Sequence, residues 1–368
     1  MSYTLTEFEA KHSDTYAMSA PAYPRAKSTL IARWVARLSW LNLAALLAIS
    51  ALLFVVSENW WLSSAMTYAP RSPYGLPALL LLVLSLMFHR SSVLINLISI
   101  AMVGGPIMGL TLPIAQWMAP PVDAQEGFKL KVVSCNVQDY RPDFAAILAE
   151  IGRFNPDVVV MQDAWDRSKL VNSYFESWHV VRHGEFFLAS RYPARLVAVG
   201  HFEAFDRDAI IQCELELPTT KVMFFNLHHM TPRHGLRELD ISSPITQRGS
   251  EQMSLYLGSR AEETIAVRDF VESHRGETPT LIAGDFNMPY ESSLYQNNWF
   301  GFQNAFNTVG IGYGYSFPCT QQYCWPAGNP WIRLDHILAD DAWKIRSCSI
   351  GKANGSDHRL ISATLVLQ

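Results

Sequence analysis

Six short polar motifs, each at the end of an apolar run typical of a buried strand, lie in the last two thirds of the chain. They occupy residues 132–136, 158–163, 224–228, 281–287, 332–335 and 356–358, and each carries Asn, Asp or His. Strands that stop on such residues deliver the side chains to one rim of a sheet. There, carboxylates can hold a divalent cation and imidazoles can act on a phosphate. The motifs therefore predict a hydrolase of phosphate esters or anhydrides.

Taken in order, the motifs resemble those of the endonuclease/exonuclease/phosphatase superfamily. Its members include deoxyribonuclease I, abasic-site endonucleases, sphingomyelinases and inositol polyphosphate phosphatases. The resemblance covers residues 130–368, and its most specific parts are Gly-Asp-Phe-Asn at 284–287 and Ser-Asp-His at 356–358. The segment Leu-Ala-Ser-Arg-Tyr-Pro at 188–193 also resembles a strand-ending segment of the family. This resemblance implies a deoxyribonuclease I-like α/β fold, a two-sheet α/β sandwich.

The resemblance also implies roles for five catalytic residues. Asp285 orients or deprotonates the attacking water, and Asn287 binds a phosphate oxygen. His358 faces the phosphate, while Asp335 accepts the other ring hydrogen of His358 and so fixes its tautomer. His228 supplies a second donor that stabilises charge in the transition state. Whether His358 or Asp285 is the general base stays open at this point.

Three further residues are expected to hold the metal, namely Asn136, Asp163 and Asp357. The expected ion is Mg²⁺, which prefers a few protein oxygens and completes its shell with water and substrate phosphate. Mn²⁺ is the alternative ion. The superfamily usually has Glu where Asp163 stands, and one methylene less moves the carboxylate inward by about 1.5 Å. For Asp163 there are three alternatives to direct Mg²⁺ ligation: it binds the metal through a water, the site prefers a different metal, or Asp163 is an ordinary strand-end carboxylate.

Two arginines in the loop after His228 are candidates for substrate binding. Arg233 and Arg237 carry guanidinium groups, which match phosphate oxygens in a bidentate way, so they are expected to bind a second phosphate of a pyrophosphate. The alternative is a solvated loop with ordinary charges.

The periodicity of the catalytic region alternates between strands and helices. Residues 130–136 and 158–162 read as strands, and residues 143–154 as an amphipathic helix. Residues 254–272 form the next predicted helix, which leads into the strand that ends on Asp285. This alternation agrees with the sandwich that the resemblance implies.

The first third of the chain holds three long apolar stretches, at about residues 38–56, 74–88 and 93–117. Crossing a hydrocarbon core of roughly 30 Å takes about 20 residues, so the first and third are long enough and the second is near the lower limit. We therefore expect three transmembrane helices before the catalytic domain. The alternative for the second stretch is a re-entrant or core helix.

The charges beside these stretches predict the orientation. Arg25, Lys27, Arg33 and Arg37 precede the first span, so the N-terminus should be cytoplasmic and, after three crossings, the catalytic domain extracytoplasmic at the cell (inner) membrane. The expected domains are a cytoplasmic tail at 1–37, a three-helix membrane domain at 38–118, a linker at 119–129 and the catalytic domain at 130–368.

The substrate class follows from charge and architecture. A net charge of −4 without a basic stripe makes nucleic acid an unlikely partner. The arrangement resembles the teicoplanin-resistance membrane phosphatases of the superfamily, which implies a membrane-anchored hydrolase of a phosphorylated lipid such as a polyprenyl pyrophosphate. The alternatives are an extracytoplasmic nuclease, a sphingomyelinase-like phosphodiesterase, and a catalytically silent membrane interaction module.

Overall fold

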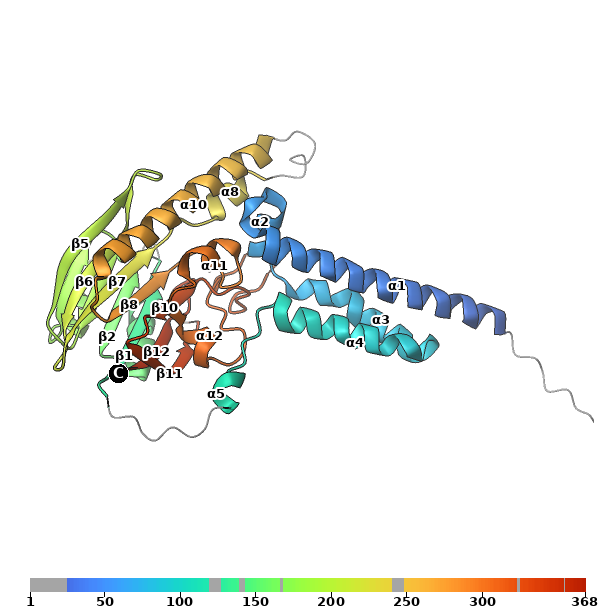
Figure 1. Cartoon of the computed structure of the whole chain (residues 1–368), viewed down its shortest axis with the longest axis horizontal. Helices are drawn as coiled ribbons and strands as arrows, with labels where there is room; N and C mark the ends of the chain where they lie inside the picture. The colour runs from blue at the N-terminus through green and yellow to red at the C-terminus, as the bar shows by residue number, and fades with distance from the viewer. Residues whose placement is uncertain are drawn as a thin grey trace, which may run out of the picture.

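The computed structural model describes residues 25–118, 127–138, 143–165, 168–239, 248–322, 325–353 and 355–368. They form an elongated helical bundle, built from the N-terminal third, and an α/β domain at one end of that bundle (Figure 1). Residues 1–24 and residues 119–126 of the predicted linker lie outside the described residues.

Three helices of the bundle run side by side, and a fourth caps the end next to the α/β domain. The three are α1 (Arg25–Ala51), α3 (Leu76–Phe88) and α4 (Val93–Met102), and the cap is α2 (Trp61–Tyr68). Asn96 of α4 is fully buried, and its side-chain amide donates to Ser39 Oγ of α1 at 3.0 Å and to Ser85 Oγ of α3 at 2.8 Å. Because polar groups in an apolar setting need internal partners, these bonds fix the three helices against one another.

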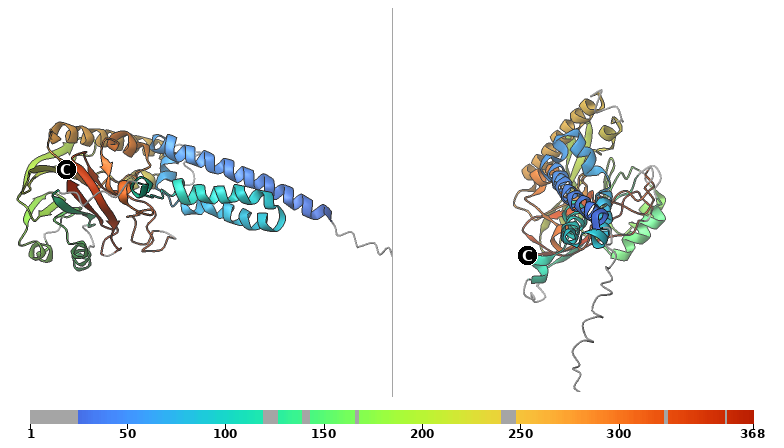
Figure 2. Two further views of the ribbon diagram at one scale, coloured as in Figure 1. Left: turned by 60° about the horizontal axis from the view of Figure 1, so that its bottom comes forward. Right: turned by 90° about the vertical axis from the view of Figure 1, so that its right-hand side faces the viewer.

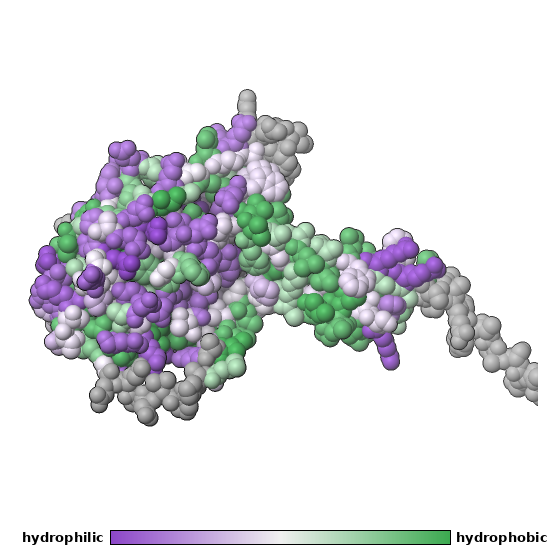
Figure 3. Space-filling view, in the orientation of Figure 1, coloured by the Kyte–Doolittle hydropathy of each residue, from purple (hydrophilic) through white to green (hydrophobic). Residues whose placement is uncertain are grey.

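Two helices of the bundle are long and apolar enough to cross a membrane, Leu30–Asn59 and Arg90–Ile107. The pair Trp61–Tyr68 and Ser72–Phe88, bent by 91°, is the third candidate. Hydrophobic residues cover the bundle surface nearest the α/β domain, and hydrophilic residues gather toward the far end (Figure 3). The third predicted apolar stretch reaches Trp117, but its long helix ends at Ile107, shortly before Gly109 with a positive φ of 73°, and only a short helix at Ile114–Met118 follows.

The α/β domain contains two six-stranded sheets. The first has the order β11-β12-β1-β2-β4-β3, with strands β1 (Lys129–Asn136), β2 (Val158–Gln162), β3 (His179–His183), β4 (Phe186–Ser190), β11 (Trp343–Ile350) and β12 (Ile361–Leu367). The second has the order β5-β6-β7-β8-β10-β9, with strands β5 (Ala194–Phe202), β6 (Arg207–Glu216), β7 (Lys221–His228), β8 (Thr280–Asp285), β9 (Gln303–Asn304) and β10 (Asp335–Ala339). The pairs β1/β2 and β7/β8 are parallel and the other pairs are antiparallel. The predicted two-sheet α/β sandwich, with apolar helices before it, is confirmed.

Helices cover the outer faces of the sandwich and connect its strands. They are α6 (Phe144–Phe154), α7 (Lys169–Tyr174), α8 (Arg233–Arg237), α10 (Arg248–Arg275), α11 (Ser293–Trp299) and α12 (Ala305–Val309). The short helix α5 (Ile114–Met118) follows the bundle and precedes β1 in the chain. The predicted helix at 143–154 is confirmed as α6, where the Asp143 side chain accepts a hydrogen bond from the Ala146 amide at 3.1 Å and caps the first turn. The helix predicted at 254–272 is confirmed within the longer α10.

The core lies between the two sheets, and further apolar clusters lie under the helices. Val132 of β1 points into the inter-sheet core, whereas its neighbour Val133 packs on the side of α6. Both faces of the strand are thus covered, which is why it reads as a continuous apolar run rather than an alternating one. Buried polar contacts also join the sheets, among them the hydrogen bond that Gln162 Nε2 donates to Asn226 Oδ1 at 2.7 Å.

The bundle is docked directly on the sandwich, as the views in Figure 2 show. Tyr313 and Tyr315 donate to the carbonyl oxygens of Gly104 and Met108 at 2.9 and 2.6 Å. The Trp331 indole donates to the Tyr68 carbonyl at 3.0 Å. The near end of the sandwich is therefore held at the end of the bundle by contacts that do not involve the linker.

Candidate active site

Sheet register brings the polar motifs together at one edge of the sandwich. Asp285, the last residue of β8, is paired with His228 of parallel β7 on one side and with Asp335 of antiparallel β10 on the other. Asn136, the last residue of β1 in the opposite sheet, donates from Nδ2 to Asp285 Oδ2 at 3.0 Å. Four predicted site residues from four strands therefore meet around the Asp285 carboxylate.

Two imidazoles flank this carboxylate. Nε2 of His228 lies 3.6 Å and Nε2 of His358 lies 3.7 Å from the same oxygen, Asp285 Oδ2. Nδ1 of His358 is 2.8 Å from Asp335 Oδ2, the partner predicted to fix its tautomer. The site is thus a buried carboxylate with an oriented imidazole on each side.

Electrostatics favour the protonated form of His358. Burial disfavours the imidazolium, but the carboxylates of Asp335 and Asp285 outweigh it and raise the pKa of His358 to about 10. Burial also raises the pKa of Asp285; the His358 and His228 charges oppose that rise and the Asp335 carboxylate adds to it. At neutral pH, His358 is consequently a donor, and Asp285 is a more basic carboxylate than one in water.

Asn287 is held in a left-handed backbone conformation, with φ at 50°. Asn tolerates this region better than most residues because its short polar side chain bonds locally. Its backbone amide donates to Asp285 Oδ1 at 2.9 Å, and its side-chain amide donates to the His229 carbonyl at 2.7 Å. Asn287 therefore lies against Asp285 and beside the strand that carries His228.

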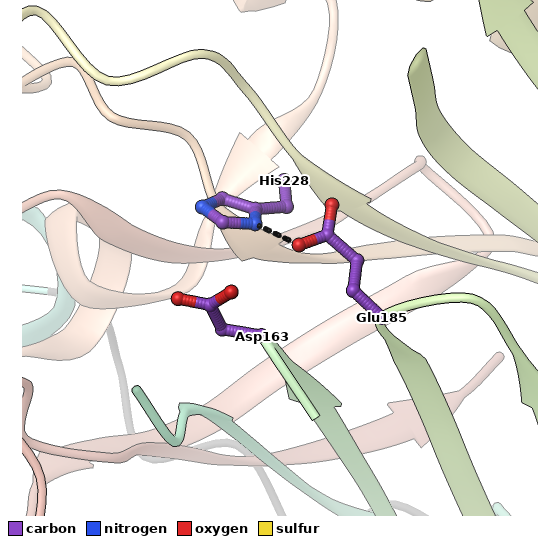
Figure 4. A group of neighbouring side chains, drawn as sticks. All are labelled: Asp163, Glu185 and His228. Atoms are coloured by element: carbon purple, nitrogen blue, oxygen red, sulfur yellow. Dashed lines mark hydrogen bonds and ion pairs between the residues drawn. The ribbon is translucent and has the colours of Figure 1, made fainter. Parts of the chain in front are cut away.

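A second acidic group surrounds His228 on its other side. Asp163, Glu185 and His228 come from three strand ends and direct ligand atoms toward one another, all within 4.8 Å (Figure 4). His228 Nδ1 is 3.0 Å from Glu185 Oε2, and Arg207 pairs with the other oxygen of Glu185. Asp163 follows β2 with a positive φ of 56°, which Asp tolerates.

Glu185 is a site residue that the sequence motifs did not reveal. Burial opposes its charge, but His228 and Arg207 outweigh burial and lower the pKa of Glu185 to about 2. In return, Glu185 and Asp285 overcome the effect of burial and raise the pKa of His228. Glu185 stands in the turn between β3 and β4, where only the folded hairpin brings it to His228, so no local pattern signals its role.

The two predicted arginines lie beyond His358. Arg233 approaches Asp357, with 3.8 Å between Arg233 Nη2 and Asp357 Oδ2, and its guanidinium lies 5.5 Å from the centre of the Phe317 ring. That ring is 4.7 Å from the His358 imidazole. Arg233 and Arg237, the ends of α8, both line a pocket of about 590 Å³ that also touches Asn287.

The donor set fits a hard divalent cation. Two groups offer clustered ligand atoms, Asp163 with Glu185 and His228, and Asp285 with Asp335 and His358. Asp335 Oδ1 is buried and has no hydrogen-bond partner among the described residues, as expected of an oxygen reserved for a ligand. The predicted metal residues do not form one cluster: Asn136 lies against Asp285, Asp163 beside Glu185, and Asp357 near Arg233.

Comparison with known protein families identifies the family to which the chain belongs. Residues 133–358 match the Endonuclease/Exonuclease/phosphatase family. The chain belongs to this family. Its members hydrolyse phosphoester bonds, usually with a divalent metal, so this endonuclease/exonuclease/phosphatase protein is a hydrolase of phosphodiester or phosphate bonds with acidic groups suited to a metal.

Solved structures of the family are similar to this chain at low identity. The endonuclease/exonuclease/phosphatase from Beutenbergia cavernae DSM 12333 shares 16% identity, with 65% of this chain and 72% of that chain covered and a TM-score of 0.46. Truncated Caenorhabditis elegans TDP2 shares 18% identity, with 65% and 98% covered and a TM-score of 0.47. D. rerio TDP2 complexed with single strand DNA product shares 14%, with 64% and 98% covered and a TM-score of 0.46. No curated protein sequence matches the chain.

Proposed function

We propose that this endonuclease/exonuclease/phosphatase protein is a membrane-anchored, Mg²⁺-dependent hydrolase of a phosphorylated lipid, such as a polyprenyl pyrophosphate. The observation that carries the proposal is the position of the catalytic edge. Asn287, two residues after Asp285, lines the same pocket as Tyr68 of α2, the helix at the end of the bundle next to the sandwich. A phosphate reached from the bilayer surface would meet the catalytic cluster directly at this pocket.

The chemistry proposed for the cluster follows from its charges. A bound divalent ion would neutralise phosphate oxygens. Of the predicted ligands, Asp163 with Glu185 beside it could hold such an ion, whereas Asn136 lies against Asp285 and Asp357 near Arg233. Asp285 accepts a proton from the attacking water, since His358, with its pKa raised to about 10, keeps its own proton at neutral pH. His228 and His358 donate to phosphate oxygens, where charge develops in the transition state.

The arginines at the pocket favour an anhydride over a simple ester. Arg233 approaches Asp357, both arginines line the pocket that Asn287 touches, and the Arg233 side chain is 44% exposed. Guanidinium groups bind phosphate oxygens in a bidentate way. The second phosphate of a pyrophosphate would therefore be bound there while the first lies at the catalytic cluster.

The same proposal places the protein in the inner membrane with its catalytic domain outside the cytoplasm. Arg33 and Arg37 lie on the part of α1 away from the sandwich, and Arg90 follows the turn between α3 and α4. Positive residues flank the cytoplasmic ends of membrane helices. The sandwich, at the opposite end of the bundle, is then extracytoplasmic.

Product formation from a substrate panel tests the proposal, measured as inorganic phosphate for the polyprenyl substrates, as phosphocholine for sphingomyelin and as nicking for plasmid DNA. The purified full-length chain is assayed in liposomes with polyprenyl pyrophosphate, polyprenyl monophosphate, sphingomyelin and plasmid DNA, each with Mg²⁺, with Mn²⁺ and with excess chelator. We expect the lipid pyrophosphate to be cleaved fastest, and only with a metal. Preferred cleavage of DNA or sphingomyelin would instead support a nuclease or a phosphodiesterase, and inactivity on every substrate would support a silent interaction module.

A further inference from the structure

The pocket beside the catalytic cluster is built from both halves of the molecule. Tyr68, from the helical bundle, forms a buried apolar cluster with Ile332 and Leu334 of the sandwich. Leu236, Phe317 and Trp331 pack against that cluster. All six residues line the pocket of about 590 Å³, a volume within the range of about 300–1,000 Å³ that small-molecule sites occupy.

The pocket adjoins the catalytic cluster on one side, and its charged groups are two arginines. Asn287 lines it and is bonded to Asp285, and Phe317 lines it and packs near His358. Arg233 and Arg237 supply its positive charges. A ligand that fills this space therefore needs an anionic group at the Asn287 end and an apolar body along Leu236 and Trp331.

We propose that this pocket binds the first isoprenoid or acyl segment of the substrate, the carbons that directly follow the phosphate. The inference rests on the proposed function and adds to it a binding site for the hydrocarbon chain. Six of the lining side chains belong to one apolar cluster, which suits a hydrocarbon segment, while Arg233 and Arg237 suit the anionic end of a phosphorylated lipid. Tyr68 makes the helical bundle part of this substrate site.

Kinetics on a series of chain lengths tests the inference with the full-length protein in detergent. The substrates are isoprenyl pyrophosphates of one, two and three isoprene units, and the measured quantity is kcat/KM. Each buried methylene should raise kcat/KM about fourfold, from about 0.8 kcal/mol of transfer free energy, so we expect at least a tenfold gain per unit until the pocket is full. A flat series would overturn the pocket assignment.

A filling variant locates the effect. Leu236 is half-buried on α8, and Leu236→Trp should reduce the ratio of kcat/KM for three units to that for one unit by at least tenfold. Leu170→Trp, the same change at an exposed residue of α7 remote from the pocket, should leave the ratio unchanged. An unchanged ratio in Leu236→Trp would contradict the inference.

Photochemical labelling of the unaltered protein covers the case in which Leu236→Trp does not fold. A three-unit isoprenyl phosphonate with a diazirine on its first unit should label peptides that contain Leu236 or Trp331. Labelling confined to the lipid-facing helices would overturn the assignment. If no pyrophosphate of any chain length is hydrolysed while a soluble phosphodiester is, the proposed function itself is wrong. If pyrophosphates are hydrolysed at rates that do not depend on chain length, only the pocket assignment is wrong.

Discussion

At the residue scale, the site consists of two imidazole–carboxylate pairs that share one central carboxylate. His358 is held by Asp335 at 2.8 Å and His228 by Glu185 at 3.0 Å, and both rings direct Nε2 to Asp285. Each outer carboxylate fixes the ring orientation and raises the pKa of the ring. The protonated His358 and the oriented His228 are therefore preorganised donors around the Asp285 carboxylate, as the proposed phosphate chemistry requires.

Asp285→Asn is expected to remove activity while the fold remains, because it keeps the shape of the side chain but removes its ability to accept a proton. Loss of a general base typically reduces the rate by about 10² to 10⁴. Phosphate release and circular dichroism measure the two properties. Asp208→Asn is the matched control. Asp208 lies on β6 and pairs with His183 of β3 and His201 of β5, not with the catalytic cluster. Full turnover by Asp285→Asn would remove Asp285 from the mechanism.

Glu185→Gln should reduce kcat by about 10- to 100-fold, the usual cost of losing a partner that orients a functional residue. The sign of the pH effect follows from the charges: Glu185 raises the pKa of His228, so its neutral replacement lowers that pKa. His228 then loses its proton at lower pH, and the alkaline limb of the pH–rate profile should move to lower pH. Glu214 of β6 pairs instead with Arg195 and Lys221 of the neighbouring strands, so Glu214→Gln should leave the alkaline limb of the profile in place. A profile that stays in place would show that His228 acts without its charge.

At the scale of elements, the close pairing of β7 and β8 depends on Gly284. A Cβ atom at this position would lie 1.8 Å from the Leu227 carbonyl oxygen of the neighbouring strand. No side chain can relieve a contact with backbone, so any other residue must separate the strands that carry His228 and Asp285.

Gly284→Ala should therefore be strongly destabilising, by more than the roughly 0.5–3 kcal/mol of most single substitutions. Gly258→Ala is the opposite control. Gly258 lies inside α10, and a Cβ atom added to it would meet no neighbouring atom within 4 Å, so alanine there should stabilise the helix by about 0.5–1 kcal/mol. Thermal denaturation of both variants gives the comparison, and a Tm for Gly284→Ala equal to the wild-type value would refute the strand-contact argument.

A buried network joins α2 to the two loops of the active site. Arg260 of α10 donates to the Met230 carbonyl at 2.9 Å and the Asn287 carbonyl at 2.8 Å. It also donates to the Tyr68 hydroxyl at 3.1 Å, and that hydroxyl donates to Glu58 at 2.9 Å. No carboxylate lies within ion-pair distance of Arg260 in the described part of the chain, so Glu58 balances its charge through Tyr68.

Glu58→Gln should accordingly reduce stability by about 1–3 kcal/mol, the cost of weakening the partner of a buried charged group. It should also lower kcat on a soluble phosphate ester, because Arg260 positions the loops that follow His228 and Asp285. Glu277→Gln, at an exposed carboxylate after α10, is the matched control. Equal kcat and Tm for Glu58→Gln and wild type would show that α2 is only a spacer.

Site residues that belong to local strand motifs could be predicted from the sequence, whereas those that only the folded chain brings to the site could not. Asp285, His358 and Asn136 follow apolar strands, so strand periodicity and motif order indicated the sandwich and its polar edge. Glu185 and Arg260 gave no such signal, because a hairpin and a helix crossing place them at the site only in the folded chain. For the same reason, the sequence indicated a tethering linker but not the direct contacts between the bundle and the active-site loops.

At the scale of the whole molecule, the bundle has two chemically different ends. Arg33 and Arg37 lie toward the free end, which is hydrophilic in Figure 3, whereas the sandwich covers the other end. The polar contacts of Asn96 with Ser39 and Ser85 lie within the bundle and hold α1, α3 and α4 together. Under the proposed function, the positively charged end of the bundle is the cytoplasmic one and the sandwich lies at the extracytoplasmic end.

Reporter fusions at two positions test both the orientation and the number of crossings. With three crossings and a cytoplasmic N-terminus, a reporter after His89, in the turn between α3 and α4, is cytoplasmic, and one after Gln368 is extracytoplasmic. We expect alkaline phosphatase, which is active only outside the cytoplasm, to be active after Gln368 and inactive after His89. If the bent pair α2 and α3 did not cross, the pattern would reverse at both positions, because only two spans would remain. A catalytic domain inside the cytoplasm would then have to meet its lipid substrate at the inner leaflet, and the extracytoplasmic part of the proposed function would be wrong.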